Sequence, residues 1–136
     1  MSLEDRIKRH EGCRSTPYKD SEGFLTVGIG RCIDKVPFSQ DEIDLMFKND
    51  FARAMAGAEA FSAYRDMDEI RQGVLIEMVF QMGVNGVGKF KKFLLAAQDH
   101  DWATAAEEML DSKWAKQTPS RAKELARIFL RGVSER

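Results

Sequence analysis

The sequence has few of the residues that disulfide-stabilised, metal-binding or membrane-spanning proteins need. Only two of its 136 residues are cysteine and two are histidine. Two cysteines make no disulfide framework, and neither His10 nor His100 lies at ligand spacing from a cysteine, so we expect no metal and no cofactor. No apolar run approaches the roughly 18 residues of a membrane span, and residues 1–12 lack the apolar core of a signal peptide.

The chain also carries almost no net charge. Its formal charge is −1 and its pI is about 6.1. Such a protein has no bulk attraction to nucleic acid or to an anionic surface, so neither is an expected partner. The composition, 43% hydrophobic and 32% charged, is typical of a soluble globular protein, and the length suffices for one domain with a modest core.

Most of the chain has the pattern of helices. Ser2 is expected to cap a short first helix that ends near Gly12. The segment Ser39–Glu42 has the S-x-x-E pattern of a capping box and opens a long helix. That helix carries one apolar stripe, as its apolar residues recur at every fourth position: Ile43, Phe47, Phe51 and Met55. Such a helix could bridge two lobes.

The second half predicts a helical bundle. A helix opens at Asp66–Glu69, and its middle, Val74–Met82, is apolar nearly all round, which is typical of a bundle centre. Three glycines should break the chain there: Gly83, Gly86 and Gly88. Three shorter helices follow, over residues 90–98, over 102–110 and from a Thr118 cap to a stop at Gly132. The last of them has inward-facing residues, which are Ala122, Leu125, Ala126 and Phe129.

Residues 18–30, YKDSEGFLTVGIG, differ from the rest of the chain. They predict two strands, residues 18–20 and 24–29, joined by a turn in which Gly23 takes a positive φ. Gly28 and Gly30 indicate a close approach of the backbone or a sharp exit. Cys13 and Cys32 flank this hairpin, so a bridge between them stays open beside the simpler interpretation of two reduced thiols.

Together these segments predict an α+β protein that is mainly α. We expect a single domain over residues 1–136, with a small hairpin-bearing N-terminal lobe at about 11–40 and a connecting helix at about 40–60. A helical C-terminal lobe then covers about 61–136, and the first helix is expected to pack on it.

Two acids and one hydroxyl in the N-terminal part suggest chemistry. Glu11 ends the first helix and Asp20 begins the hairpin turn, so the two carboxyl groups could face each other across a cleft. Glycoside hydrolysis needs one protonated acid for the leaving oxygen and one ionised acid for water or the sugar. Thr26, on the returning strand, could hold a water. The alternative is that Glu11 is a solvated helix-end acid and Asp20 forms the turn through its own backbone hydrogen bonds.

Three blocks resemble the phage-type lysozymes, glycoside hydrolase family 24. The first has an acid before Gly12 and then the pattern Y-x-D-x-x-G-x-x-T-x-G-x-G, from Tyr18 to Gly30. The second is MVFQMGVNGVGKF, which resembles the buried central helix of the family and its exit. The third is SKWAKQTPSRAKE, which resembles the W-x-x-Q-T-P-x-R-A cleft segment. The resemblance covers almost the whole chain in order and implies a lysozyme-like fold.

The resemblance also implies roles for individual residues. Glu11 matches the general acid, Asp20 the opposite carboxylate and Thr26 the hydroxyl that helps to hold the attacking water in an inverting reaction. Residues matching the C-terminal side of the cleft are Gln81, Gln117, Thr118 and Arg121. Arg121 is expected to pair with Glu11 and orient it. Trp114 is expected in the core rather than as a platform for sugar.

The chain departs from the family pattern in three places. Only RCIDKVPF separates Gly30 from the helix at Ser39, so part of the cleft wall is missing or rebuilt. Arg31 stands where the family member used for comparison has histidine, and Glu77 stands where it has asparagine. Glu77 could favour the protonated form of Glu11, or it could pair with an arginine. We count Arg31 and Glu77 among the candidate substrate-binding residues.

The expected activity is that of a muramidase, which hydrolyses the β-1,4 bond between N-acetylmuramic acid and N-acetylglucosamine in peptidoglycan. The alternatives are a lytic transglycosylase, which typically needs no water-activating base, and a non-catalytic wall-binding module, which would be expected to lose an acid. The family implies a monomeric phage or prophage endolysin that stays in the host cytoplasm until a holin-like pore lets it reach the wall.

Overall fold

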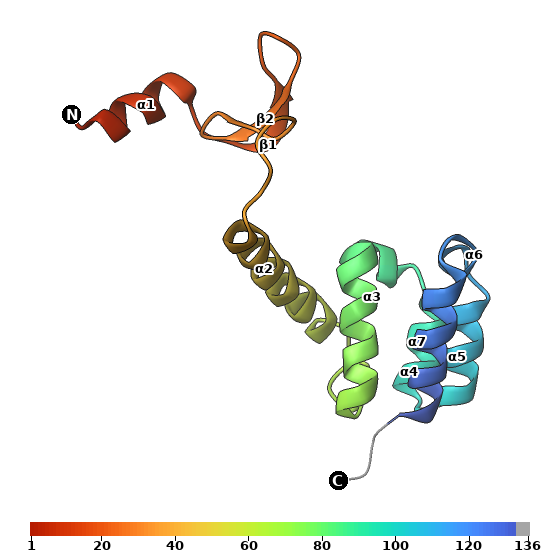
Figure 1. The fold of residues 1–136 in the computed structure, drawn as a ribbon. Helices are drawn as coiled ribbons and strands as arrows, with labels where there is room; N and C mark the ends of the chain where they lie inside the picture. Colours follow the sequence, from red (N-terminus) through yellow and green to blue (C-terminus); the bar gives the residue numbers. More distant parts are fainter. Residues whose placement is uncertain (133–136) are drawn as a thin grey trace. The chain divides into compact units, whose positions relative to one another are not determined.

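A computed structural model describes residues 1–132 and divides the chain into two compact units, residues 1–46 and the residues from Phe47 onward (Figure 1). The first unit contains α1 (Leu3–Glu11), β1 (Arg14–Lys19), β2 (Leu25–Gly28), β3 (Arg31–Cys32) and the start of α2 (Gln40–Glu59). The second contains the rest of α2, α3 (Glu69–Gly88), α4 (Lys91–Gln98), α5 (Trp102–Leu110), α6 (Lys113–Gln117) and α7 (Pro119–Arg131). The predicted α+β, mainly α class is confirmed.

The first helix begins and ends where the sequence predicted. The Ser2 hydroxyl accepts from the Asp5 N–H at 3.0 Å, and the Asp5 carboxylate accepts from the Ser2 N–H, which completes a capping box. Gly12 ends α1 with φ +76°. No residue of α1 is buried. Its predicted packing on the helical part of the chain stays a prediction.

The sheet has three antiparallel strands in the order β1-β2-β3, one more than predicted. Tyr18 lies opposite Thr26, and Thr26 lies opposite Cys32. The register between β1 and β2 shifts between Arg14 and Tyr18, so β1 is irregular there, around Pro17, which has no N–H to donate. The third strand escaped prediction because two residues are too few to show an alternating pattern.

The sheet order also bears on the cysteines. Cys32 is on β3, whereas Cys13 directly precedes β1, and β2 lies between these two strands. Two strand spacings amount to roughly 9–10 Å, more than the 7 Å or so that a disulfide can bridge between Cα atoms. Both cysteines are free in the structure, as the simpler interpretation predicted.

The capping box at the start of α2 is also present. The Ser39 N–H donates to Glu42 Oε1 at 2.8 Å, and the Glu42 N–H donates to the Ser39 hydroxyl at 3.3 Å. Along the predicted apolar stripe, the rings of Phe47 and Phe51 lie 5.9 Å apart. The fully buried residues of α2 are instead two alanines, Ala54 and Ala58.

The third helix differs from its prediction in two respects. Asp68 caps it, and the buried residues include Val74, Leu75, Met78 and Val79, but Phe80 is exposed, so α3 is buried on one face rather than all round. Gly83 interrupts the helical geometry with φ +79° and ψ 166°, as a break at this glycine requires. Gly86, which was also expected to break the chain, lies inside the helix instead, whereas Gly88 is its last residue.

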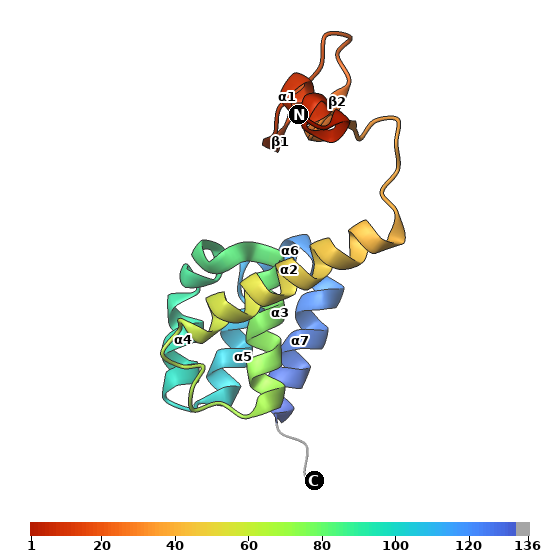
Figure 2. The same cartoon turned by 90° about the vertical axis from the view of Figure 1, so that its left-hand side faces the viewer.

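Four helices, α3, α4, α5 and α7, contribute most of the core of the second unit and run side by side in Figure 2. Its largest fully buried side chains are Phe93, Phe129, Leu75, Met78, Met109 and Val87. The residues of α7 that were predicted to face inward are all buried. Trp114 is 4% exposed and belongs to this core, which confirms the prediction for that residue. The five-residue helix α6 was not predicted. Among the described residues, no helix has the length and apolar character to cross a membrane.

One charged side chain is buried in this core. Arg71 is 7% exposed, and its guanidinium donates to the backbone oxygens of Phe129 and Leu130 at 2.6 and 3.0 Å. It also donates to Asp68 at 2.8 Å and lies 4.1 Å from the centre of the Trp102 ring. Arg71 thus satisfies two of the carbonyl groups that the end of α7 leaves without helical partners.

Candidate active site

Glu11 is the last residue of α1, and its carboxyl group is exposed. The side chain lies against Gly30, in the turn between β2 and β3. A methyl group on Gly30 would lie 2.8 Å from Cδ and 3.1 Å from Cγ of Glu11, so a side chain at this position would have to displace the carboxyl group. Gly30 also has φ +71°, a conformation that side chains rarely adopt. The glycine therefore leaves the space that the carboxyl group of Glu11 fills.

Asp20 is held by the hairpin turn that it begins. Its Oδ1 accepts from the N–H groups of Glu22 and Phe24, both at 2.9 Å. Its own N–H donates to the Phe24 oxygen at 2.9 Å, and Gly23 takes the predicted positive φ, +87°. The turn-forming role considered from the sequence is thus present. The two hydrogen bonds to Oδ1 fix the direction of the carboxylate. Oδ2 accepts no hydrogen bond among the described residues and is available to another donor.

Thr26 is a buried polar residue of the first unit. It is 4% exposed, and its hydroxyl donates to the Phe24 oxygen at 3.1 Å. Because the hydroxyl proton is used in this bond, the Thr26 oxygen keeps its capacity to accept. Tyr18 lies opposite Thr26 in the sheet, so Thr26 is two residues from Asp20 in the pairing register.

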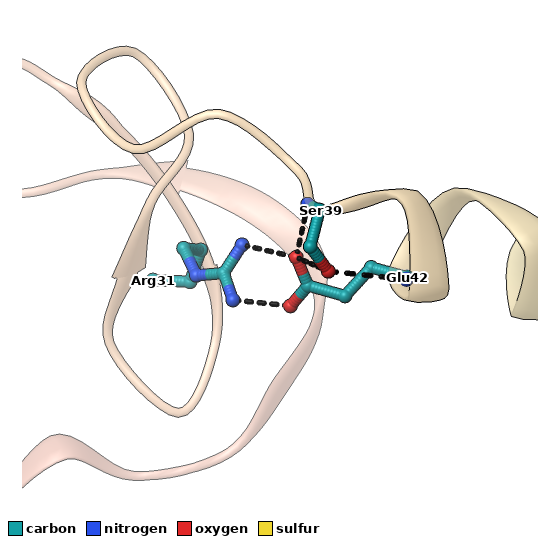
Figure 3. Close-up of polar contacts among 3 residues, drawn as sticks. All are labelled: Arg31, Ser39 and Glu42. Atoms are coloured by element: carbon teal, nitrogen blue, oxygen red, sulfur yellow. Dashed lines mark hydrogen bonds and ion pairs between the residues drawn. The ribbon is translucent and has the colours of Figure 1, made fainter.

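Arg31 is bound by a residue that the sequence had marked only as a helix cap. Its guanidinium forms a two-pronged ion pair with Glu42, with Nη1 at 3.1 Å from Oε1 and Nη2 against Oε2 (Figure 3). The hydrogen bond from Arg31, followed by that from the Ser39 N–H, lowers the pKa of Glu42 to about 2. The same hydrogen bond raises the pKa of Arg31. The pair joins β3 to the first turn of α2.

In the second unit, the structure pairs Glu77 with Arg121. The Arg121 Nε donates to Glu77 Oε2 at 2.9 Å, which agrees with the arginine pairing considered for Glu77. Both side chains are nearly half exposed, at 45% and 40%. They line an otherwise apolar pocket of about 300 Å³, whose remaining walls are Phe47, Phe51, Gly73, Ile76 and Phe80. The expected pairing of Arg121 with Glu11 stays a prediction.

Two other predicted cleft residues gather around Trp114. The indole Nε1 donates to the Gln81 Oε1 at 2.9 Å, and the Thr118 hydroxyl donates to the Trp114 backbone oxygen at 3.1 Å. Thr118 occupies the N-cap position of α7 as predicted, but it makes no side-chain capping bond because its hydroxyl is used in this way. The bond from Trp114 fixes the Gln81 oxygen inward and leaves its NH₂ group as a free donor. Gln117 is exposed.

Sequence reasoning did not anticipate the contacts of Gly30 and Glu42. The G-x-G pattern did signal a close approach at Gly30, but it could not name Glu11 as the group that approaches. Glu42 had a local role as a cap, and its pairing with Arg31 depends on how the chain folds between residues 31 and 39. The ion pair could be recognised only once the fold had placed the two charged side chains next to each other.

A sequence profile of the phage lysozyme family matches residues 8–132. The chain belongs to this family. Two proteins of Dictyostelium discoideum, named probable T4-type lysozymes 1 and 2, are 31% and 33% identical to it, in alignments that cover 97% of the chain and 95% of each relative. The pre-baseplate central spike protein Gp5 of Enterobacteria phage T4 is 31% identical over 99% of the chain, which spans only 28% of that protein.

Family membership identifies the chain as a lysozyme, a glycosidase of peptidoglycan. The Dictyostelium alignments run over 162 positions, more than the 136 residues of the chain, so these relatives have residues with no counterpart here. This agrees with a chain that is shorter than its family pattern.

Proposed function

We propose that this lysozyme is a muramidase that cleaves the β-1,4 bond between N-acetylmuramic acid and N-acetylglucosamine with inversion. The observation that carries the proposal is the contrast between the two acids of the first unit. Glu11 extends an exposed carboxyl group over Gly30, whereas Asp20 is clamped by two backbone N–H groups. One acid is exposed and can reach a leaving oxygen, and the other has a fixed direction.

Each proposed role uses the atom that the structure leaves free. Glu11 gives its proton to the glycosidic oxygen. Asp20 accepts a proton from the attacking water through Oδ2, since Oδ1 is used by the turn. Thr26 accepts the second hydrogen of that water, because its own proton is bonded to the Phe24 oxygen. A water held by two acceptors directs its lone pair at the anomeric carbon, which an inverting reaction requires.

Residues of the second unit that match the cleft segment of the family are proposed to contact the substrate. The free NH₂ group of Gln81 suits an acetamido or peptide carbonyl oxygen. Gln117 and Thr118 are polar neighbours at the start of α7, and the Glu77–Arg121 pair lines the apolar pocket. Arg31 would act mainly by holding β3 against α2, although 32% of its side chain stays exposed.

The proposed biological role is that of a monomeric phage or prophage endolysin. The enzyme would remain in the host cytoplasm until a holin-like pore opens the way to the wall. The match to the phage lysozyme family supports this role. No cofactor enters the proposed reaction, because acid, base and water suffice for glycoside hydrolysis.

The experiment that tests the proposal compares clearing of a bacterial wall suspension by wild type and by Glu11→Gln. We expect the variant to lose at least about a hundredfold in rate, the usual contribution of a positioned general acid, with little change in folding. Glu4→Gln is the matched control, since Glu4 is an exposed acid at the start of the same helix. Near-normal clearing by a folded Glu11→Gln protein would refute the assignment of the acid.

A further inference from the structure

Four lysines surround a pocket on the second unit that the proposed reaction does not use. The pocket has a volume of about 470 Å³ and lies where α4 begins and α5 passes into α6. The lysines are Lys89, Lys91, Lys92 and Lys113. Aromatic side chains of Phe90, Phe93 and Trp114 line it as well, and the latter two are nearly fully buried.

Within residues 1–132, these lysines have no carboxylate within ion-pair distance. The four ion pairs of the described residues all involve arginine, and none includes a lysine of the pocket. Glu108 and Asp111 also line the pocket, yet neither lies within ion-pair distance of a lysine. The lining therefore keeps a net charge of +2 in a chain whose formal charge is −1. Such a local excess of positive charge attracts an anion even where the whole protein does not.

The backbone at the start of α4 adds to the same attraction. Phe90 stands at the N-cap of α4 and makes no side-chain capping bond, so the first N–H groups of this helix have no side-chain acceptor. Lys91 and Lys92 are the first two residues of that helix. The two lysine side chains and the free N–H groups thus belong to one turn.

We propose that this pocket binds phosphate groups of an anionic phosphodiester polymer in the bacterial envelope. The inference rests on the proposed action at the wall, because it is there that the enzyme would meet such a polymer. Binding would hold the enzyme on the wall between cleavages, apart from the acids that cut the glycan.

Lysine is the reason to choose phosphate over carboxylate. Lysine ammonium groups bind phosphate as flexible point charges, and they lack the planar fork with which arginine makes a two-pronged match to a carboxylate. A pocket of this volume also has room for a phosphate together with the polyol or sugar that it links. The apolar floor of Phe90 and Trp114 suits the carbon skeleton of that linker.

The first measurement is titration calorimetry of wild-type protein with inorganic tripolyphosphate and, separately, with citrate at the same ionic strength. We expect tripolyphosphate to bind more tightly. The double variant Lys91→Gln with Lys92→Gln should weaken tripolyphosphate binding about fivefold or more, since two exposed charge contacts are lost. Lys48→Gln with Lys123→Gln removes the same charge from exposed sites outside the pocket and should bind as wild type does.

The second measurement uses the wall itself. The Glu11→Gln protein should sediment with phosphopolymer-bearing walls and lose most of this binding once hydrofluoric acid has stripped the polymer. Adding the two lysine substitutions should have the same effect as stripping.

Three results would overturn the inference: equal losses in the pocket and control variants, equal or tighter binding of citrate, or unchanged sedimentation after stripping. None of these measurements needs turnover. If the enzyme clears walls normally but the binding measurements fail, the phosphate site alone is refuted. The proposed muramidase activity would stand.

Discussion

Gly30 lies against the carboxyl group of Glu11 in a backbone conformation with φ +71°. Two separate effects follow from a side chain at this position. The backbone would be strained by about 1–2 kcal/mol, as for any residue in a left-handed conformation. The new Cβ would in addition displace the proposed acid.

Gly23 provides a control, because a side chain there would strain the backbone without displacing the proposed acid. Gly23 has φ +87°, and a Cβ there would meet no atom within 4 Å. We expect Gly30→Ala and Gly23→Ala to lose similar stability in urea unfolding. Gly30→Ala should lose at least about tenfold more wall-clearing activity, because an ångström of misplacement is costly in a catalytic group. Equal activities in the two variants would show that Gly30 does not position Glu11.

Asp20 combines a turn-forming role with the proposed role of base, and two substitutions separate them. Asn keeps an oxygen that can accept from the N–H groups of Glu22 and Phe24, so Asp20→Asn should retain most of the stability but lose wall clearing. Ala removes both functions, so Asp20→Ala should lose activity and about 1 kcal/mol of stability as well. Wall clearing by Asp20→Asn at a near-normal rate would show that Asp20 forms the turn but does not act as the base.

At the scale of elements, the pair of Arg31 and Glu42 joins the last strand of the sheet to the first turn of α2. The pKa of Glu42 falls to about 2 in the folded protein, below its ordinary value of 4.5. A carboxyl group whose pKa is lowered by folding contributes stability above its unfolded pKa and loses that contribution as the pH falls toward the folded value. The contribution should therefore be complete above about pH 5 and should decline toward pH 2.

Glu42→Gln tests this dependence because Gln can still accept the capping bond from Ser39. We expect wild type to be more stable than the variant near neutral pH, with the difference shrinking between about pH 5 and pH 2. Both tryptophans lie in the second unit, so amide signals of the sheet in NMR spectra should be followed instead. A difference that is constant across this range would contradict an ionic contribution of Glu42.

The elements that were predicted correctly have signals within a few residues of sequence. The capping boxes at Ser2 and Ser39, the turn at Gly23 and the stop at Gly132 all depend on local backbone geometry. The errors have another origin. Gly86 remains inside the helix despite the low helix propensity of glycine, because neighbouring packing can override it. The strand at Arg31–Cys32 is defined by pairing with β2 and has no pattern of its own.

The candidate site was predictable in part for the same reason. The motif named Glu11, Asp20 and Thr26, but their contacts depend on segments that meet only in the folded chain. Gly30 reaches Glu11 across 19 positions of sequence, and Arg71 reaches the end of α7 across 58. Arg71 precedes the apolar stretch Val74–Met82, and its sequence neighbours did not indicate the carbonyl groups that it satisfies.

At the scale of the whole molecule, the chain is a member of the phage lysozyme family with an α+β, mainly α fold. The described residues place the two proposed catalytic acids and the proposed water-holding hydroxyl in the first unit, and most of the proposed substrate contacts in the second.

The most direct test of the central claim is the mass of the muropeptide products released from purified peptidoglycan in oxygen-18 water. Hydrolysis by an Asp20-activated water predicts products with a reducing N-acetylmuramic acid end that carries one labelled oxygen from the solvent. Glu11→Gln should release none of them. Anhydro products that lack this oxygen would instead show a transglycosylase, and they would contradict the proposed roles of Asp20 and Thr26.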